Sequence, residues 1–117
     1  MKIRKKRVYE YSEASDGCRI LVDRIWPRGV KKADADLNLW LKVVAPSSEL
    51  RKWFGHDPAK FPLFRQKYWE ELETDSEKQE GLRTIQSKAQ EGPVTLVYAA
   101  KDEVYNHVVV LEAFLKT

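Results

Sequence analysis

The sequence predicts an α/β fold: a three-layer single domain in which helices flank a small, mainly parallel sheet. Short apolar runs typical of strands alternate along the chain with longer stretches of helical periodicity, which indicates parallel strands joined by helices. The chain has 117 residues, 43% of them hydrophobic and 33% charged, which suits one compact core. We therefore expect a single domain over residues 1–117.

The first half of the chain contains three candidate strands. Residues 3–9 are rich in Lys and Arg and precede a Ser/Asp/Gly loop, which indicates a charged strand at an edge of the sheet. Residues 18–23 form an almost continuous apolar run that ends in an acid, as expected of a buried strand. Residues 37–44 alternate only in part, so they predict a short strand and leave a helix open as the alternative.

Helical segments are expected after the third strand. Ser47 or Ser48 can cap a short helix, and Gly55 can close it in the left-handed conformation. Asp57 resembles the N-cap of a further turn, but Pro62 interrupts that turn, so we expect the helix to restart near Pro62. An apolar stripe at four-residue spacing then predicts a helix that packs on the core through Phe64, Tyr68 and Leu72.

The last third of the chain predicts a helix, a strand and a second helix. A capping-box spacing in residues 74–77 begins a helix that Gly92 and Pro93 end. Residues 93–100 form the strongest strand because they are rich in β-branched residues, and we expect this strand in the centre of the sheet. After a polar loop, helical periodicity predicts a final helix with Val108, Leu111 and Leu115 on its core face.

Charge is distributed unevenly along the chain. The net charge is +3, yet residues 1–32 hold ten basic and four acidic side chains. A basic N-terminal face can attract nucleic acid or a smaller anion. Because +3 is small for a dedicated DNA-binding protein, a small anionic ligand is the first expectation and nucleic acid the second. The cations at residues 4–7 can equally guard an edge strand against pairing between sheets.

Composition limits the other partners. No apolar stretch reaches the roughly 20 residues of a membrane-spanning helix, and the first residues lack the apolar region of a signal peptide, so we expect a cytoplasmic protein without membrane contact. Cys18 is the single cysteine, which excludes an internal disulfide. No Cys/His cluster indicates a metal site, and no glycine-rich phosphate loop or dinucleotide fingerprint indicates a cofactor. Oligomeric state and enzymatic turnover stay open.

The carboxyl ends of parallel strands are where we expect a ligand, because loops and helix N-termini converge there. Residues 23–29 follow the second predicted strand, and residues 101–107 follow the strongest one. We expect these two polar loops to line one hollow. The candidate ligand-binding residues are Arg24, Trp26, Arg28, Lys101 and Asn106, and the candidate catalytic residues are Asp23, Asp102 and His107.

The candidates are named for their chemistry, and each has a structural alternative. Arg24 and Arg28 can hold a phosphate or carboxylate with paired donors, or form ion pairs that fix their loop. Trp26 can stack on a planar ring, or close an edge of the core. His107 can move a proton with an aspartate as its partner, although a histidine beside a helix start is more often structural. Asn106 is the expected cap of the last helix.

Three motifs resemble those of a known family. Residues 21–29 (LVDRIWPRG), 45–58 (APSSELRKWFGHDP) and 97–107 (VYAAKDEVYNH) are similar, in content and order, to the YeaO-like branch of the domain-of-unknown-function family 488. The likeness spans nearly the whole chain. It implies a compact α/β domain with a polar cleft, in a family without a settled activity.

The sequence departs from the wider family at the start of the last helix. The resemblance implies an acid-arginine pair after one strand, matched here by Asp23 and Arg24, and a Cys-His-Arg trio at the final helix. Here the trio reads Asn106-His107-Val108, so any activity that needs the cysteine and arginine is in doubt. The predicted function is binding of an anionic, nucleotide-like small ligand. The alternatives are a nucleic-acid-associated or regulatory module and a partner-binding protein with exposed tryptophans.

Overall fold

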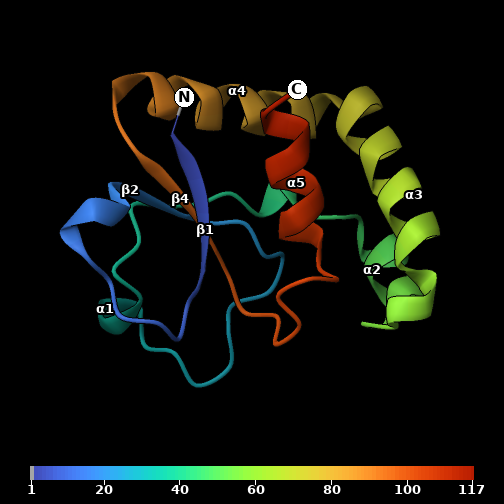
Figure 1. Ribbon diagram of the computed structural model, residues 1–117, viewed down its shortest axis with the longest axis horizontal. Helices are drawn as coiled ribbons and strands as arrows, with labels where there is room; N and C mark the ends of the chain where they lie inside the picture. The colour runs from blue at the N-terminus through green and yellow to red at the C-terminus, as the bar shows by residue number, and fades with distance from the viewer. Residues whose placement is uncertain (1) are drawn as a thin grey trace.

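The computed structural model describes residues 2–117 and contains one four-stranded parallel sheet (Figure 1). The strands are β1 (Ile3–Arg7), β2 (Cys18–Leu21), β3 (Leu39–Trp40) and β4 (Val94–Tyr98). Their order is β1-β4-β2-β3, so β4 pairs with β1 on one side and with β2 on the other. The predicted edge position of the first strand and the central position of the strongest strand are both confirmed.

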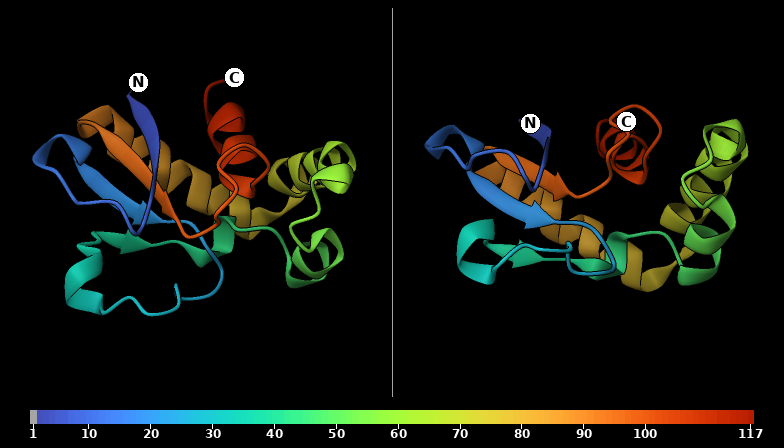
Figure 2. Two further views of the ribbon diagram at one scale, coloured as in Figure 1. Left: turned by 60° about the horizontal axis from the view of Figure 1, so that its bottom comes forward. Right: turned by 90° about the horizontal axis from the view of Figure 1, so that it is seen from below.

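Helices cover the sheet and extend beyond it. The described helices are α1 (Lys32–Ala35), α2 (Ser48–Phe54), α3 (Phe61–Thr74), α4 (Ser76–Glu91) and α5 (His107–Leu115). α5 contacts β1 and β4, and α4 contacts β4. Figure 2 shows α2 and α3 standing to one side of the sheet, where α3 packs against α5. The α/β class with a parallel sheet and flanking helices is therefore confirmed.

Two apolar clusters hold the layers together. The larger cluster joins α3, α4 and α5 to one face of the sheet and includes the fully buried Phe64, Tyr68 and Leu111. Successive strand residues point to opposite faces, so Leu21 and Val97 belong to the smaller cluster on the other face. That face is covered by α1, by Trp26 from the loop after β2 and by Trp40 from β3. The third layer of the predicted sandwich is thus thin.

The local signals around α2 and α3 act as the sequence predicts. The Ser47 hydroxyl accepts a hydrogen bond of 3.2 Å from the first turn of α2, and Gly55 ends that helix with φ 54°. Asp57 caps a 3-10 turn over Pro58–Lys60. α3 then begins at Phe61, so Pro62 lies in its first turn, where its missing N–H costs no hydrogen bond.

Several local expectations differ from the structure. The capping-box expectation is wrong: Thr74 ends α3 and its hydroxyl bonds back to the Glu70 carbonyl, while Asp75 caps α4. The first strand ends at Arg7, two residues earlier than expected. In residues 37–44 both alternatives are partly realised, because a two-residue β3 is followed by the 3-10 turn Lys42–Val44. The four-residue α1 has no capping side chain, which explains why its sequence gives no signal.

Candidate functional site

The two predicted loops meet at one cavity of about 630 Å³. Asp23 and Arg24 follow β2, Ala99 and Lys101 follow β4, and Tyr9 lies just beyond β1. Figure 1 shows both loops leaving the lower edge of the sheet. The cavity therefore lies at the carboxyl ends of parallel strands, as expected, and its volume is within the roughly 300–1,000 Å³ of small-molecule sites.

The walls of the cavity are largely apolar. Ile25 and Pro27 come from the loop after β2, and Pro46 comes from the segment before α2. Phe54 of α2 and Phe64 of α3 complete this wall, with their rings stacked at a centroid distance of 4.1 Å. A ligand in the cavity can therefore bury an organic body and is not limited to a bare inorganic ion.

Arg24 is the cavity cation that the chain itself holds in place. Its Nε donates to the Pro46 carbonyl at 3.0 Å, and its Nη2 lies 3.4 Å from the Ala45 carbonyl. The side chain therefore ties the loop after β2 to the segment that leads into α2. This structural role exists whether or not a ligand is bound.

Arg28, Arg51 and Lys101 are exposed cations that also line the cavity. Within residues 2–117, none of the three side chains makes a hydrogen bond, an ion pair or a cation–π contact. Their charges therefore remain available to an anion. Sequence reasoning missed Arg51, because nothing in the sequence shows which side of the two-turn α2 meets the cavity. His56, for which the sequence favours a structural role beside the capping Asp57, also lines the cavity, from a left-handed turn with φ 58°.

The predicted catalytic residues Asp23 and His107 are in contact. Asp23 Oδ1 lies 3.2 Å from His107 Nε2, and Asp23 Oδ2 accepts the backbone N–H of Ala99 at 2.9 Å. The same His107 nitrogen is 3.1 Å from the carbonyl oxygen of Val22. The pair thus connects the ends of β2 and β4 to the first residue of α5.

Asp102 and Asn106 shape the loop that leads into α5. Asp102 Oδ1 accepts the N–H groups of Tyr105 and Val104, both at 2.9 Å, and these two hydrogen bonds lower the pKa of the Asp102 carboxyl. A carboxyl group that stays ionised is a weak general acid. Asn106 is buried, accepts a bond from Val109 N at 3.0 Å, and donates to the Asp102 carbonyl at 2.7 Å. The expectation that Asn106 caps the last helix is confirmed.

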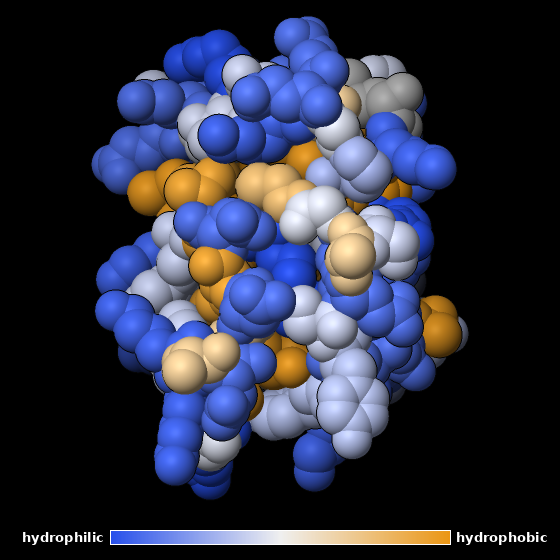
Figure 3. All heavy atoms as spheres, turned by 90° about the vertical axis from the view of Figure 1, so that its left-hand side faces the viewer, coloured by the Kyte–Doolittle hydropathy of each residue, from blue (hydrophilic) through white to orange (hydrophobic). Residues whose placement is uncertain are grey.

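Trp26 lines the cavity and also closes the smaller apolar cluster. Its Nε1 donates to the Val30 carbonyl at 2.7 Å, and its ring meets Trp40 edge-on at a centroid distance of 5.3 Å. Trp69 packs in the same manner against Phe114. Trp53 is the one exposed tryptophan among residues 2–117, so the four tryptophans form no common exposed patch of the kind that the partner-binding alternative requires. On the face shown in Figure 3, hydrophobic residues form small groups between hydrophilic ones.

The basic side chains of β1 are engaged within the chain. Lys5 Nζ lies 2.8 Å from Glu112, and Lys6 Nζ lies 3.0 Å from Asp16. Arg7 donates to the carbonyls of Ala99 and Ala100, and Arg4 donates to the carbonyl of Ser15. These four cations tie the edge strand to neighbouring segments, so they do not form an open row that could track a nucleic-acid backbone.

Residues 2–117 offer neither a metal-binding cluster nor a membrane-spanning helix. No group of three or more His, Cys, Asp or Glu side chains in this part of the chain is placed to hold a metal ion. None of its helices is both long and apolar enough for a bilayer crossing.

Comparisons with known proteins agree on one family. The chain is 46% identical over 117 residues to the uncharacterized protein YeaO of Escherichia coli (strain K12), which covers 100% of this chain and 99% of the relative. It is 42% identical over 114 residues to the uncharacterized protein Rv3073c of Mycobacterium tuberculosis (strain ATCC 25618 / H37Rv), which covers 97% and 93%. No solved structure gives a significant match. Residues 2–117 match the family described as the inactive DUF488-N3 subclade, and the chain therefore belongs to the DUF488-N3i family.

Proposed function

We propose that the protein binds a small organic anion of nucleotide-like size in the cavity at the carboxyl ends of β2 and β4. One contrast carries the proposal. The cations of β1 are engaged by carboxylates and carbonyls of the same chain, whereas the side chains of Arg28, Arg51 and Lys101 have no partner within residues 2–117 and surround an apolar-walled cavity. Unpartnered guanidinium groups can bind a phosphate or carboxylate with two parallel hydrogen bonds.

The parts of the cavity have complementary roles in this proposal. Arg28 and Arg51 approach the anion from the loop after β2 and from α2, and Lys101 approaches it from the loop after β4. The N-terminus of α5 adds a partial positive charge at the same end of the sheet. Ile25 and Phe54 offer apolar surface to the body of the ligand.

The proposal is one of binding and assigns no reaction. Two of the three predicted catalytic groups have structural tasks, since Asp23 joins two strand ends and Asp102 holds two backbone amides. The family is described as inactive, which also favours binding over turnover. Binding at the basic edge strand, the nucleic-acid alternative, is not proposed because its cations are already engaged.

Calorimetric titration with inorganic phosphate, a nucleoside monophosphate and a small aromatic carboxylate tests the proposal, with tryptophan fluorescence as a second signal, since Trp26 lines the cavity. We expect at least one anion to bind, and we expect Arg28→Ala combined with Arg51→Ala to weaken it at least tenfold, since charge-assisted bonds are worth about 1.5–3 kcal/mol each. The matched control is Arg83→Ala, which removes an exposed arginine that does not line the cavity.

The double variant should melt at the same temperature as the parent protein, because neither side chain has a partner within residues 2–117 to lose. The proposal fails if none of the anions binds at millimolar concentration. It also fails if the double variant and the Arg83→Ala control bind equally well.

A further inference from the structure

The hydrogen bond of His107 fixes which of its ring nitrogens carries the proton. Nε2 lies 3.1 Å from the carbonyl oxygen of Val22, and a carbonyl oxygen can only accept a hydrogen bond. The other nearby atom is Asp23 Oδ1, at 3.2 Å, which as a carboxylate oxygen is an acceptor too. Nε2 must therefore be the protonated nitrogen, and in the neutral ring Nδ1 carries a lone pair.

His107 Nδ1 keeps access to the cavity. It makes no hydrogen bond within residues 2–117. Within residues 2–117, only one fully buried side-chain nitrogen or oxygen lacks a hydrogen-bond partner, and that atom is Asp23 Oδ1. Because Nδ1 of His107 also lacks a partner and is not that atom, Nδ1 must be accessible to solvent. Because His107 lines the cavity, the lone pair of Nδ1 is open to a bound ligand.

The orientation of the ring is held from three sides. A half-turn of the imidazole would place a C–H group against the Val22 carbonyl and lose the hydrogen bond. Asp23 is itself fixed by the backbone N–H of Ala99, and the ring of Tyr68 meets the imidazole edge-on at 6.3 Å. Such support holds one tautomer in one orientation.

Nδ1 differs in kind from the three exposed cations that line the same cavity. Arg28, Arg51 and Lys101 can only donate hydrogen bonds, and the buried Oδ1 of Asp23 is out of reach. A ligand that satisfies both the cations and His107 must therefore carry an anionic group and a separate donor. A hydroxyl group is such a donor.

We propose that His107 acts as a specificity-determining acceptor, which selects a hydroxyl-bearing organic phosphate or carboxylate through Nδ1. This inference rests on the proposed function and names the class of anion that the cavity takes. The site would prefer a polyol phosphate, a sugar phosphate or the ribose part of a nucleotide over an anion of equal charge that lacks hydroxyls.

The tautomer is tested first, without any ligand. The chain has two histidines, so His56→Gln leaves His107 as the single source of imidazole signals in ¹⁵N NMR. At a pH at which the ring is uncharged, we expect the Nε2–H tautomer. A ring protonated at Nδ1, or an even mixture of tautomers, overturns the inference.

Selectivity is tested with two ligands of matched charge and length, glycerol 3-phosphate and propyl phosphate. We expect glycerol 3-phosphate to bind roughly five- to tenfold more tightly, the effect of about one hydrogen bond. His107→Phe, which keeps a ring and removes both nitrogens, should bring the ratio close to one while propyl phosphate still binds. The wild-type ratio and the tautomer need no change at His107, so both measurements stand even if the phenylalanine variant fails to fold.

The outcomes separate the two proposals. Equal binding of the two phosphates to the wild-type protein overturns the role of His107 and leaves anion binding intact. An unequal ratio that survives His107→Phe in a folded protein also overturns it. Failure of both phosphates, and of every other anion tested, overturns anion binding and the role of His107 together.

Discussion

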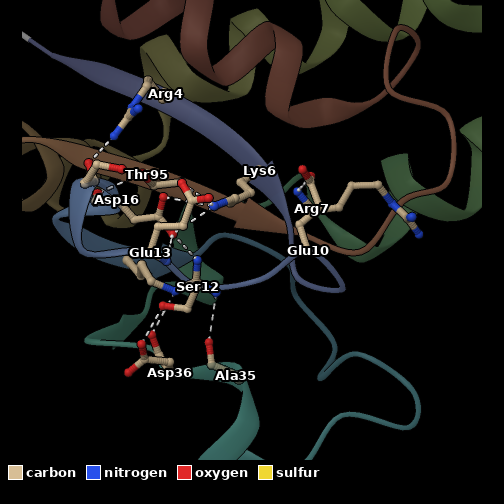
Figure 4. A network of polar contacts seen from close by, with 12 residues as sticks. Arg4, Lys6, Arg7, Glu10, Ser12, Glu13, Asp16, Ala35, Asp36 and Thr95 are labelled. Carbon is tan, nitrogen blue, oxygen red and sulfur yellow. Dashed lines mark hydrogen bonds and ion pairs between the residues drawn. The ribbon is translucent and has the colours of Figure 1, made fainter.

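The guanidinium of Arg19 lies 2.7 Å from the carboxylate of Asp16, and both residues are only 3% exposed. Arg19 also donates to the carbonyls of Ala35 and Asp36, each at 2.9 Å. Lys6 approaches the other Asp16 oxygen at 3.0 Å, in the network that Figure 4 shows. This buried group of charges joins β1, β2 and the end of α1, at the opposite end of β2 from the cavity.

The Asp16 network predicts a loss of stability in acid. Burial alone would raise the pKa of Asp16, but hydrogen bonds from Glu13, Lys6 and Arg19 outweigh it and hold the pKa below its ordinary value. Asp16 therefore stabilises the fold above the unfolded-state pKa of about 3.9, and this contribution is lost as the pH falls through the lower folded-state value. Urea unfolding between about pH 2 and pH 7 measures it.

Asp16→Asn should destabilise the fold at neutral pH by about 3–5 kcal/mol, because it leaves the buried Arg19 without its carboxylate. The same variant should show a weaker dependence of stability on acid pH. Asp34→Asn is the matched control, since Asp34 is exposed on α1. Equal acid sensitivity of Asp16→Asn and the parent protein would contradict the prediction.

Gly81 is expected to be required for the close approach of α4 to the turn before Ala45. A Cβ at this position would lie 2.5 Å from Val44 Cγ1 and 3.1 Å from Val43 Cγ2. Alanine is favoured over glycine by about 1 kcal/mol in an ordinary helix, but overpacking here should cost more, so we expect Gly81→Ala to destabilise the fold by about 1–3 kcal/mol. Chemical unfolding measures the difference.

A second substitution tests the cause. In the Gly81→Ala background, Val44→Ala should cost less than it does in the parent protein, because it removes the methyl group that the new Cβ meets. Strict additivity of the two changes would show that the contact is not the reason for the loss.

Arg24 and Arg51 should respond differently to truncation. Arg24→Ala removes the hydrogen bonds to the Pro46 and Ala45 carbonyls, so it should lower stability by about 1–3 kcal/mol. Arg51→Ala should leave the melting temperature unchanged and weaken anion binding, because the Arg51 side chain has no partner within residues 2–117. Thermal melting and calorimetry measured on both variants separate the two roles. A loss of stability in Arg51→Ala as large as in Arg24→Ala would refute this division.

Salt distinguishes the cavity from a nucleic-acid surface. Binding of a small anion by two or three cations should weaken only modestly as salt rises, whereas binding to DNA weakens with a slope of about −0.9 for each phosphate contact. We expect no tight binding of a short DNA duplex even at low salt, since the β1 cations are engaged by residues such as Glu112 and Asp16. Gel shift at several salt concentrations checks this. Tight binding with a steep slope would favour the nucleic-acid alternative.

Much of the fold could be predicted from the sequence because its main elements carry strong local patterns. The β-branched run at Val94–Tyr98 specifies a buried strand. The stripe of Phe64, Tyr68 and Leu72 specifies the side of α3 that faces the core. The short α1 lacks such a pattern, and its end is held by long-range bonds from Arg19. No local pattern reports a contact of that kind.

The candidate site was predictable only in part, for a similar reason. The loops after β2 and β4 could be paired because parallel strands end at the same edge of a sheet. The position of Arg51 depends on how α2 packs beside α3. That contact is fixed by the Glu71 carboxylate, which accepts hydrogen bonds from Ser47 N at 2.9 Å and from Ser47 Oγ at 2.7 Å. Ser47 and Glu71 are 24 positions apart, and neither residue indicates the other in the sequence.

The wall of the cavity is assembled from stretches as far apart in the chain as Tyr9, Pro46, Phe64 and His107. These residues span positions 9 to 107, so the binding surface forms only when segments from nearly the whole domain have folded together. A molecule bound there contacts distant segments of the folded chain at once, and its binding should raise the melting temperature. A thermal-shift screen of metabolites can therefore find the natural occupant without any assay of its chemistry.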